Sequence, residues 1–201
     1  MTVTALPHTE NALARRITDW MEPSNVIILV SLGVGVAQDN PLTGLAWALE
    51  AIAFAAAIPM AYIKFGMRRG MWADRHVGQR QRRMLLIPVI MASVAIGIGL
   101  MAWLDAPKAM VALVFAMLAT LAVLLPVTAF WKISVHTAVA GGALAMLALT
   151  WGPRVWIAYP VIAIIAWSRI SLRDHTLGQT IAGAVAGTVT AGLVFAALGG
   201  R

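Results

Sequence analysis

The chain has 201 residues, of which 61% are hydrophobic and only 11% are charged, and its mean hydropathy is +0.84. A soluble domain carries about a quarter charged residues and cannot bury so much apolar surface at this length. The absence of cysteine excludes a disulfide framework, a thiolate metal site and a cysteine nucleophile. The composition therefore predicts a single membrane domain.

The formal net charge of +7 comes mainly from cations in the links between apolar stretches. No part of the chain remains for a fold that reads bases, so we expect no nucleic-acid partner. Membrane lipids and a phosphorylated substrate suit these cations better. Residues 1–24 have no signal-peptide pattern, and they predict a short interfacial tail with Leu13, Ile17 and Trp20 on one side of a helix.

Hydropathy predicts an all-α fold, a polytopic membrane helix bundle with six core transmembrane helices and a short N-terminal hydrophobic segment. A bilayer core about 30 Å thick needs roughly 20 apolar residues per helix. The expected spans are 42–63, 84–104, 109–130, 135–150, 153–167 and 177–198, and 25–38 is short for a crossing. We expect residues 25–201 to form one transmembrane domain. Gly183 and Gly187 in the last span predict close packing within the chain.

Three polar clusters, at 71–83, 131–137 and 168–179, are separated from one another by two spans each. An even number of crossings returns the chain to the same side, so all three clusters should meet at one membrane face. They hold three of the four histidines, and ten of the 15 basic residues fall in or beside them. Snorkelling explains a single Lys or Arg at a helix end, but it does not explain histidines beside cations at two helix starts.

This collection of side chains favours phosphoryl chemistry. Imidazole can attack phosphorus or donate a proton, and guanidinium groups bind equatorial oxygens in pairs. A zinc site formed by His76, His136 and His175 is an alternative, but the surrounding arginines would repel a dication. Acidic residues are too few for a two-metal carboxylate site. We therefore expect no metal.

The clusters resemble the three motifs of the type-2 phosphatidic acid phosphatase superfamily: Lys-x6-Arg-Pro, Pro-Ser-Gly-His and Ser-Arg-x5-His-x3-Asp. Ser168-Arg169 followed after five residues by His175 fits the third motif, and Ser134-Val135-His136 keeps the Ser and His of the second. The first cluster fits in two registers, Arg75-x6-Arg82 or His76-x6-Arg83, neither of which is followed by proline.

The resemblance implies roles for these positions. His175 would be the nucleophile and His136 the general acid, with Arg169 at the reacting phosphate. Gln179 stands where the family has an aspartate that orients the nucleophile; its amide oxygen can still accept a hydrogen bond but supplies no charge. The residues expected to bind the substrate phosphate are Arg75, His76, Arg82, Arg83, Lys132, Ser134 and Ser168.

The resulting hypothesis is a transmembrane phosphatase domain at 25–201 that hydrolyses a phosphomonoester or diphosphate on a polyprenyl-linked lipid or a phospholipid. It would work through a phosphohistidine intermediate, with no metal and no cofactor. The alternatives are a non-catalytic anion or lipid transporter that uses the same basic vestibule, and a relative of the phosphatases that has lost activity. A homo-oligomer is compatible with the sequence.

We expect a multi-pass protein of the plasma membrane. The excess of Lys and Arg at the motif face points that face to the cytoplasm. A phosphate site needs those cations on either side, however, so this inference about sidedness is confounded.

Overall fold

The computed structural model describes residues 11–71 and 80–199, and within 80–84 it describes the backbone alone. Every regular element in these residues is helical, which confirms the predicted all-helical class. The elements are α1 (Ala12–Trp20), α2 (Pro23–Gly35), α3 (Pro41–Ile52), the π-helix η1 (Ala53–Ala57), α4 (Ile58–Arg68), α5 (Arg80–Trp103), α6 (Lys108–Phe130), α7 (Val135–Trp151), the 3₁₀-helix η2 (Pro153–Ala158), α8 (Pro160–Ser171) and α9 (Leu177–Leu198).

Several helices are apolar and long enough to cross a bilayer, as a membrane protein requires. In the described residues four stretches meet this condition, namely Pro41–Arg68, Leu85–Trp103, Lys108–Phe130 and Leu177–Leu198. Pro23–Gly35 and Val135–Trp151 are apolar but shorter. At 1.5 Å per residue, the 13 residues of α2 extend about 20 Å, roughly two-thirds of a bilayer core. The count of six core spans is therefore not confirmed.

The expected span at 153–167 is divided into two helices. Gly152 has a φ of +92°, and the chain then forms the 3₁₀-helix η2 before α8 begins at Pro160. Proline has no N–H to continue a hydrogen-bond ladder and is favoured at the first position of a helix, as Pro160 is in α8. The α-helix consequently begins later than expected and ends at Ser171.

A π-helix interrupts the long helical stretch formed by α3, η1 and α4. Pro59 follows the π-helix and cannot donate to the ladder, and such interruptions are where π-helical turns occur. The hydroxyl of Ser93 on α5 donates to the carbonyl of Phe54 at 2.7 Å. One turn earlier, both carboxylate oxygens of Glu50 are buried and make no hydrogen bond to any described residue.

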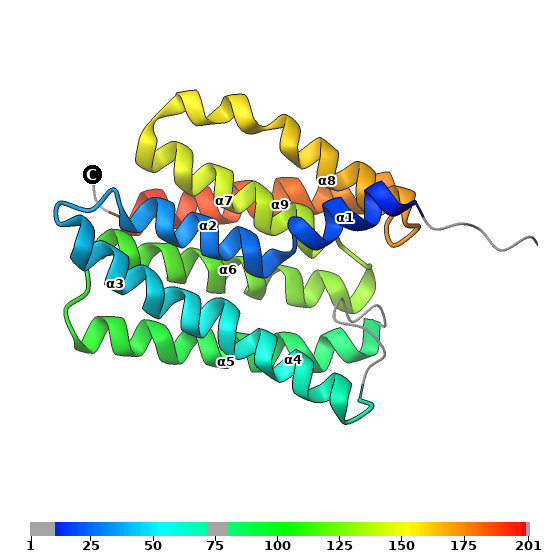
Figure 1. Ribbon diagram of the computed structural model, residues 1–201, viewed down its shortest axis with the longest axis horizontal. Coiled ribbons are helices and arrows are strands. Elements are labelled where there is room, and N and C mark those ends of the chain that lie inside the picture. Colours follow the sequence, from blue (N-terminus) through cyan, green and yellow to red (C-terminus); the bar gives the residue numbers. More distant parts are fainter. Residues whose placement is uncertain (1–10, 72–79, 200–201) are drawn as a thin grey trace, which may run out of the picture.

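Helix α7 runs through the middle of the bundle and packs most closely on α9 (Figure 1). Glycines of α9 line the contact between α7 and α9. A methyl group on Gly187 would overlap the carbonyl of Ala138, and one on Gly183 would overlap the carbonyl of Ser134. The predicted role of these glycines in packing within the chain is confirmed.

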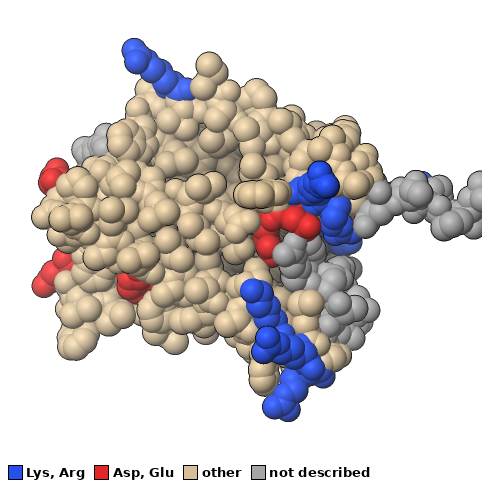
Figure 2. Space-filling model, viewed as in Figure 1, with Lys and Arg blue, Asp and Glu red and all other residues tan. Residues whose placement is uncertain are grey.

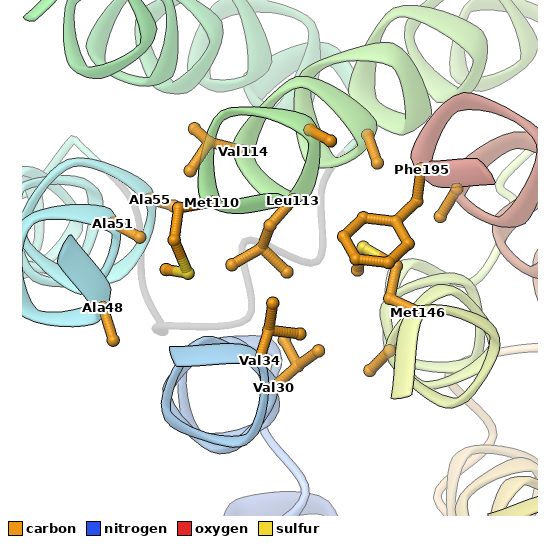
Figure 3. Packing of buried hydrophobic residues seen from close by; sticks show 14 of the residues in the cluster. Val30, Val34, Ala48, Ala51, Ala55, Met110, Leu113, Val114, Met146 and Phe195 are labelled. Atoms are coloured by element: carbon orange, nitrogen blue, oxygen red, sulfur yellow. The ribbon is translucent and has the colours of Figure 1, made fainter. Parts of the chain in front are cut away.

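The largest cluster of buried apolar side chains fills the bundle near the C-terminal ends of α2, α7 and α9 (Figure 3). Val30 and Val34 of α2 meet Leu113 of α6, with Met146 of α7 and Phe195 of α9 beside them. Trp151 closes this end by donating its indole N–H to the carbonyl of Gly33 at 2.9 Å. The opposite end of the bundle is the one that holds the motif residues.

Candidate active site

The second and third motifs lie together at the end of the bundle where α7 and α9 begin and α8 ends (Figure 1). The backbone amide of Ser134 donates to the carbonyl of Gln179 at 3.2 Å, and the hydroxyl of Thr137 donates to the carbonyl of Thr180 at 2.8 Å. These bonds join the first turn of α7 to the first turn of α9. Two helix N-termini, which attract anions, therefore converge at this end.

The imidazole of His175 is held through its Nδ1 atom. This atom lies 3.1 Å from the backbone oxygen of Lys132 and 3.3 Å from Oε1 of Gln179. Because both neighbours are hydrogen-bond acceptors, Nδ1 must carry a proton. The side chain is only 6% exposed, and Nε2 is shielded from solvent.

Gln179 contacts His175 while it also caps α9. Its Oε1 accepts the backbone N–H of Thr176 at 3.1 Å, and the hydroxyl of Thr176 accepts the backbone N–H of Gln179 at 3.4 Å. This reciprocal capping box holds the amide in a single orientation, with its oxygen toward the imidazole. The glutamine supplies an acceptor to His175 but no charge.

His136 lies in the first turn of α7 and is also 6% exposed. Ser134 is the N-cap of this helix, and its hydroxyl accepts the backbone N–H of Thr137 at 3.5 Å. A capping serine fixes where a helix begins, and here it places His136 on the second helical residue. Nε2 of His136 is buried, like that of His175.

Arg169 is the largest side chain with almost no exposure, at 1%. Its Nη2 pairs with Oδ2 of Asp174 at 2.9 Å, and its Nε and Nη1 atoms are buried. Its backbone carbonyl accepts the amides of Asp174 and His175 at 3.1 and 3.3 Å. The arginine thus fixes the backbone of the candidate nucleophile, and Asp174 orients the guanidinium.

Two of the expected phosphate ligands have other contacts. The hydroxyl of Ser168 donates to the carbonyl of Ile165 at 2.8 Å and lies 3.1 Å from the hydroxyl of Thr18 on α1. Lys132 touches His175 through its backbone oxygen, and its side chain is half-buried. Their binding of phosphate stays a prediction.

The first cluster lies largely outside the described residues. Arg75 and His76 fall there, and so therefore does the third ligand of the zinc alternative. Arg82 and Arg83 belong to the first turn of α5, which begins at the same end of the bundle, but their side chains are not described.

An apolar cavity of about 150 Å³ leads from His136 into the bundle. Its polar lining comes from Glu22, Ser24 and His136. The remaining walls are apolar side chains of α2, η1, α4, α5, α6 and α7, among them Ile27, Met60, Leu86, Ile90, Met117 and Leu124.

Charge is distributed unevenly along the bundle. Figure 2 shows most of the Lys and Arg side chains of the visible face gathered at the motif end, beside a patch of acidic side chains, with one isolated cation and further acids toward the other end. Lys64, Arg68 and Arg69 lie exposed at the end of α4. Cations gathered in this way attract anions toward that end of the bundle.

Sequence reasoning missed two partners of the motif residues. The carbonyl of Lys132 has no sequence signal, because every residue carries a carbonyl group. Thr18, which reaches Ser168, lies 150 residues away in the chain. The capping box Thr176-x-x-Gln179, in contrast, could have been found from its spacing.

These features define a class of protein, a helical protein with several helices apolar enough to cross a membrane and with buried histidine and arginine side chains at one end. The PAP2 superfamily model matches residues 125–201 and so includes the second and third motifs, which confirms the resemblance to type-2 phosphatidic acid phosphatases. This superfamily generally comprises phosphatases. No curated protein and no solved structure matches the chain.

Proposed function

We propose that the protein is a lipid phosphate phosphatase that works through a phosphohistidine intermediate. The observation that carries the proposal is the pair of acceptors on Nδ1 of His175, the Lys132 carbonyl and Oε1 of Gln179. With Nδ1 as the donor, the neutral imidazole has its lone pair on Nε2, the atom that would act as the nucleophile toward phosphorus.

In the first step Nε2 of His175 forms a bond to phosphorus, and the bond from phosphorus to the lipid oxygen breaks. Protonated His136 gives its proton to that oxygen, so a neutral lipid alcohol leaves. Arg169 and the N-termini of α7 and α9 stabilise the charge on the phosphoryl oxygens. In the second step neutral His136 takes a proton from water, whose oxygen attacks phosphorus, and phosphate and free His175 result.

The apolar cavity supports a substrate with a hydrocarbon tail. Its volume of about 150 Å³ is similar to that of an apolar protein cavity that accepts a six-carbon ring. It therefore suits the carbons nearest the phosphate, while the rest of a polyprenyl or acyl tail extends between helices into the bilayer. His136 borders the cavity, as a proton donor to the lipid oxygen must.

The test is phosphate release from a panel of lipid phosphates and diphosphates by the purified protein in nanodiscs with EDTA. We expect steady release by the wild type, none above background for His175→Ala, and wild-type release for Arg154→Ala at the other end of the bundle. Trapping of radioactive phosphate on His175 should accompany turnover. No release from any lipid by a folded protein would refute the proposal and favour a non-catalytic binding or transport role.

His136→Ala tests the general acid separately. An alkyl phosphate needs a proton on its leaving oxygen, whereas a nitrophenyl phosphate does not. We expect a loss of about 10²- to 10⁴-fold with the lipid substrate and a much smaller loss in phosphohistidine formation with the nitrophenyl ester. Equal losses with both would exclude proton donation by His136.

We further propose that the protein resides in the plasma membrane with the motif end toward the cytoplasm. Lys64, Arg68 and Arg69 support this orientation by the positive-inside rule, because they lie apart from the motif residues. The chain has no cysteine, so a single cysteine introduced at Gly70 can be labelled uniquely. We expect an impermeant reagent not to label this cysteine in intact cells. Labelling would show that the motif end faces outward and would contradict the proposed orientation.

A further inference from the structure

Helix α1 lies outside the segment that matches the superfamily, yet it packs directly on the helix that carries Arg169. Asn11 caps α1 by accepting the backbone amides of Leu13 and Ala14 at 3.1 and 3.2 Å. Ala14 and Thr18 form its inner face and are 0% exposed. Helix α1 is therefore tied to the helix that carries part of the third motif.

The hydroxyl groups of Thr18 and Ser168 make the central contact, at 3.1 Å. A serine hydroxyl has one hydrogen, and Ser168 donates it to the carbonyl of Ile165 at 2.8 Å. Thr18 must then be the donor to Ser168. The result is a buried chain of hydrogen bonds from α1 through Ser168 to the backbone of α8.

This chain of hydrogen bonds reaches the last turn of α8, which positions two candidate catalytic residues. Arg169 follows Ser168 directly, and its carbonyl accepts the amide of His175 at 3.3 Å. A shift of this turn would move the guanidinium and the backbone of the nucleophile together. Displacements on the order of 1 Å at such a site lower activity strongly.

The outer face of α1 is apolar and basic. Leu13 is 60% exposed and Trp20 is 77% exposed, and Arg16 lies exposed between them. Asn25 holds the end of α1 by donating to the carbonyls of Asp19 and Trp20. Helix α1 lies at the motif end of the bundle (Figure 1), and a helix face with Trp, Leu and Arg is favoured at the level of lipid head groups.

We propose that α1 is an interfacial positioning helix, seated in the head-group layer of the surrounding bilayer and holding Arg169 in place through the contact of Thr18 with Ser168. The positioning role rests on the proposed phosphatase function. The position of α1 in the head-group layer does not rest on that function, and it can be measured whether or not the protein has phosphatase activity.

Thr18→Val tests the positioning role, because valine keeps the shape and removes the donor. We expect kcat/KM for a lipid phosphate in nanodiscs to fall about tenfold, with the expression yield and melting temperature near those of the wild type. Thr18→Ser should restore most of the activity. Thr150→Val is the matched control, since Thr150 is a buried threonine whose hydroxyl bonds the carbonyl of Met146 at the other end of the bundle.

A double-mutant cycle separates positioning from a general structural effect. If Thr18 acts through Arg169, Thr18→Val should cause no further loss when Arg169 is already alanine. Additive losses, or wild-type kcat/KM for Thr18→Val, would overturn the positioning role. A wild-type protein that releases no phosphate would instead refute the proposed function, and the positioning role with it.

Spin labels on single introduced cysteines test whether α1 lies in the head-group layer. We expect a label at Trp20→Cys in nanodiscs to lie at a depth between the labels at Asp39→Cys, in an exposed link, and Leu193→Cys, on the exposed face of α9. The measure is accessibility to oxygen against a water-soluble nickel complex. If the Trp20→Cys label were as accessible to the nickel complex as the Asp39→Cys label, this face of α1 would lie in water. That result would refute the proposed position of α1 in the head-group layer.

Discussion

Gln179→Glu tests whether His175 gains positive charge during the reaction. Glutamate has the shape of glutamine, so it keeps the capping box with Thr176 and its Oε1 remains about 3.3 Å from Nδ1 of His175. The substitution adds a negative charge next to the imidazole. That charge should stabilise the transition state in which Nε2 bonds to phosphorus and the ring becomes cationic.

The size of the effect follows from the geometry. At 3.3 Å and an effective dielectric constant of about 20, a charge pair gains about 5 kcal/mol. Desolvation of the carboxylate offsets most of this gain, and hydrogen bonds to charged groups exceed neutral ones by about 1 kcal/mol net. A gain of about 1 kcal/mol corresponds to roughly fivefold in the rate of phosphohistidine formation.

Rapid-quench measurement of the alcohol released in the first turnover isolates this step from hydrolysis of the intermediate. Gln179→Met is the matched control, because it removes the acceptor while the Lys132 carbonyl still holds Nδ1. We expect this variant to lose less than tenfold in rate and about 1 kcal/mol in stability through the lost cap. A first step in Gln179→Glu no faster than in the wild type would refute charge development on His175.

Three further substitutions test the packing and the electrostatics of the bundle. Gly187→Ala should destabilise the protein by about 1–3 kcal/mol, because its methyl group overlaps a carbonyl of α7, whereas Gly192→Ala on the same helix has room and should melt like the wild type. Asp174→Asn should lower kcat/KM about tenfold by releasing the Arg169 guanidinium, and it should also lower stability, because the guanidinium that loses its carboxylate is 1% exposed; unchanged kinetics would exclude this orienting role. Glu50→Met should raise stability by about 1–3 kcal/mol, because it removes buried carboxylate oxygens that bond no described residue, and a lower melting temperature would contradict this.

Much of the fold and the position of the motifs could be predicted from the sequence. Hydropathy and the number of crossings between clusters place His136 and His175 at one end, because each crossing reverses the side of the membrane. The glycine spacing predicts close packing of the last helix within the chain, and the structure shows that its partner is α7. These predictions depend on local composition and on whether the number of membrane crossings between two clusters is odd or even. Both can be read from the sequence.

Contacts made by backbone atoms or by distant side chains could not be predicted in the same way. The Lys132 carbonyl reaches His175 only because the link between α6 and α7 turns back toward α9. Ser168 was expected at the phosphate, but its hydroxyl turns to Ile165 and Thr18, and nothing in the local sequence signals that α1 docks there. The 3₁₀-helix before Pro160 shows how a short apolar stretch can be mistaken for one continuous span.

For the proposed phosphatase, the site would combine strong attraction for an anion with weak support for a cationic imidazole. Two helix N-termini and Arg169 favour a bound phosphate dianion, while Gln179 supplies no charge to His175, and the nearby Asp174 is engaged by Arg169. We therefore expect tight substrate binding with a slow first chemical step. The carboxylate of Gln179→Glu should then raise the dissociation constant of the lipid phosphate as well as the rate of the first step, since it repels the anion. Single-turnover titration separates the two quantities, and tighter binding by this variant would contradict the assignment of the phosphate to this end of α9.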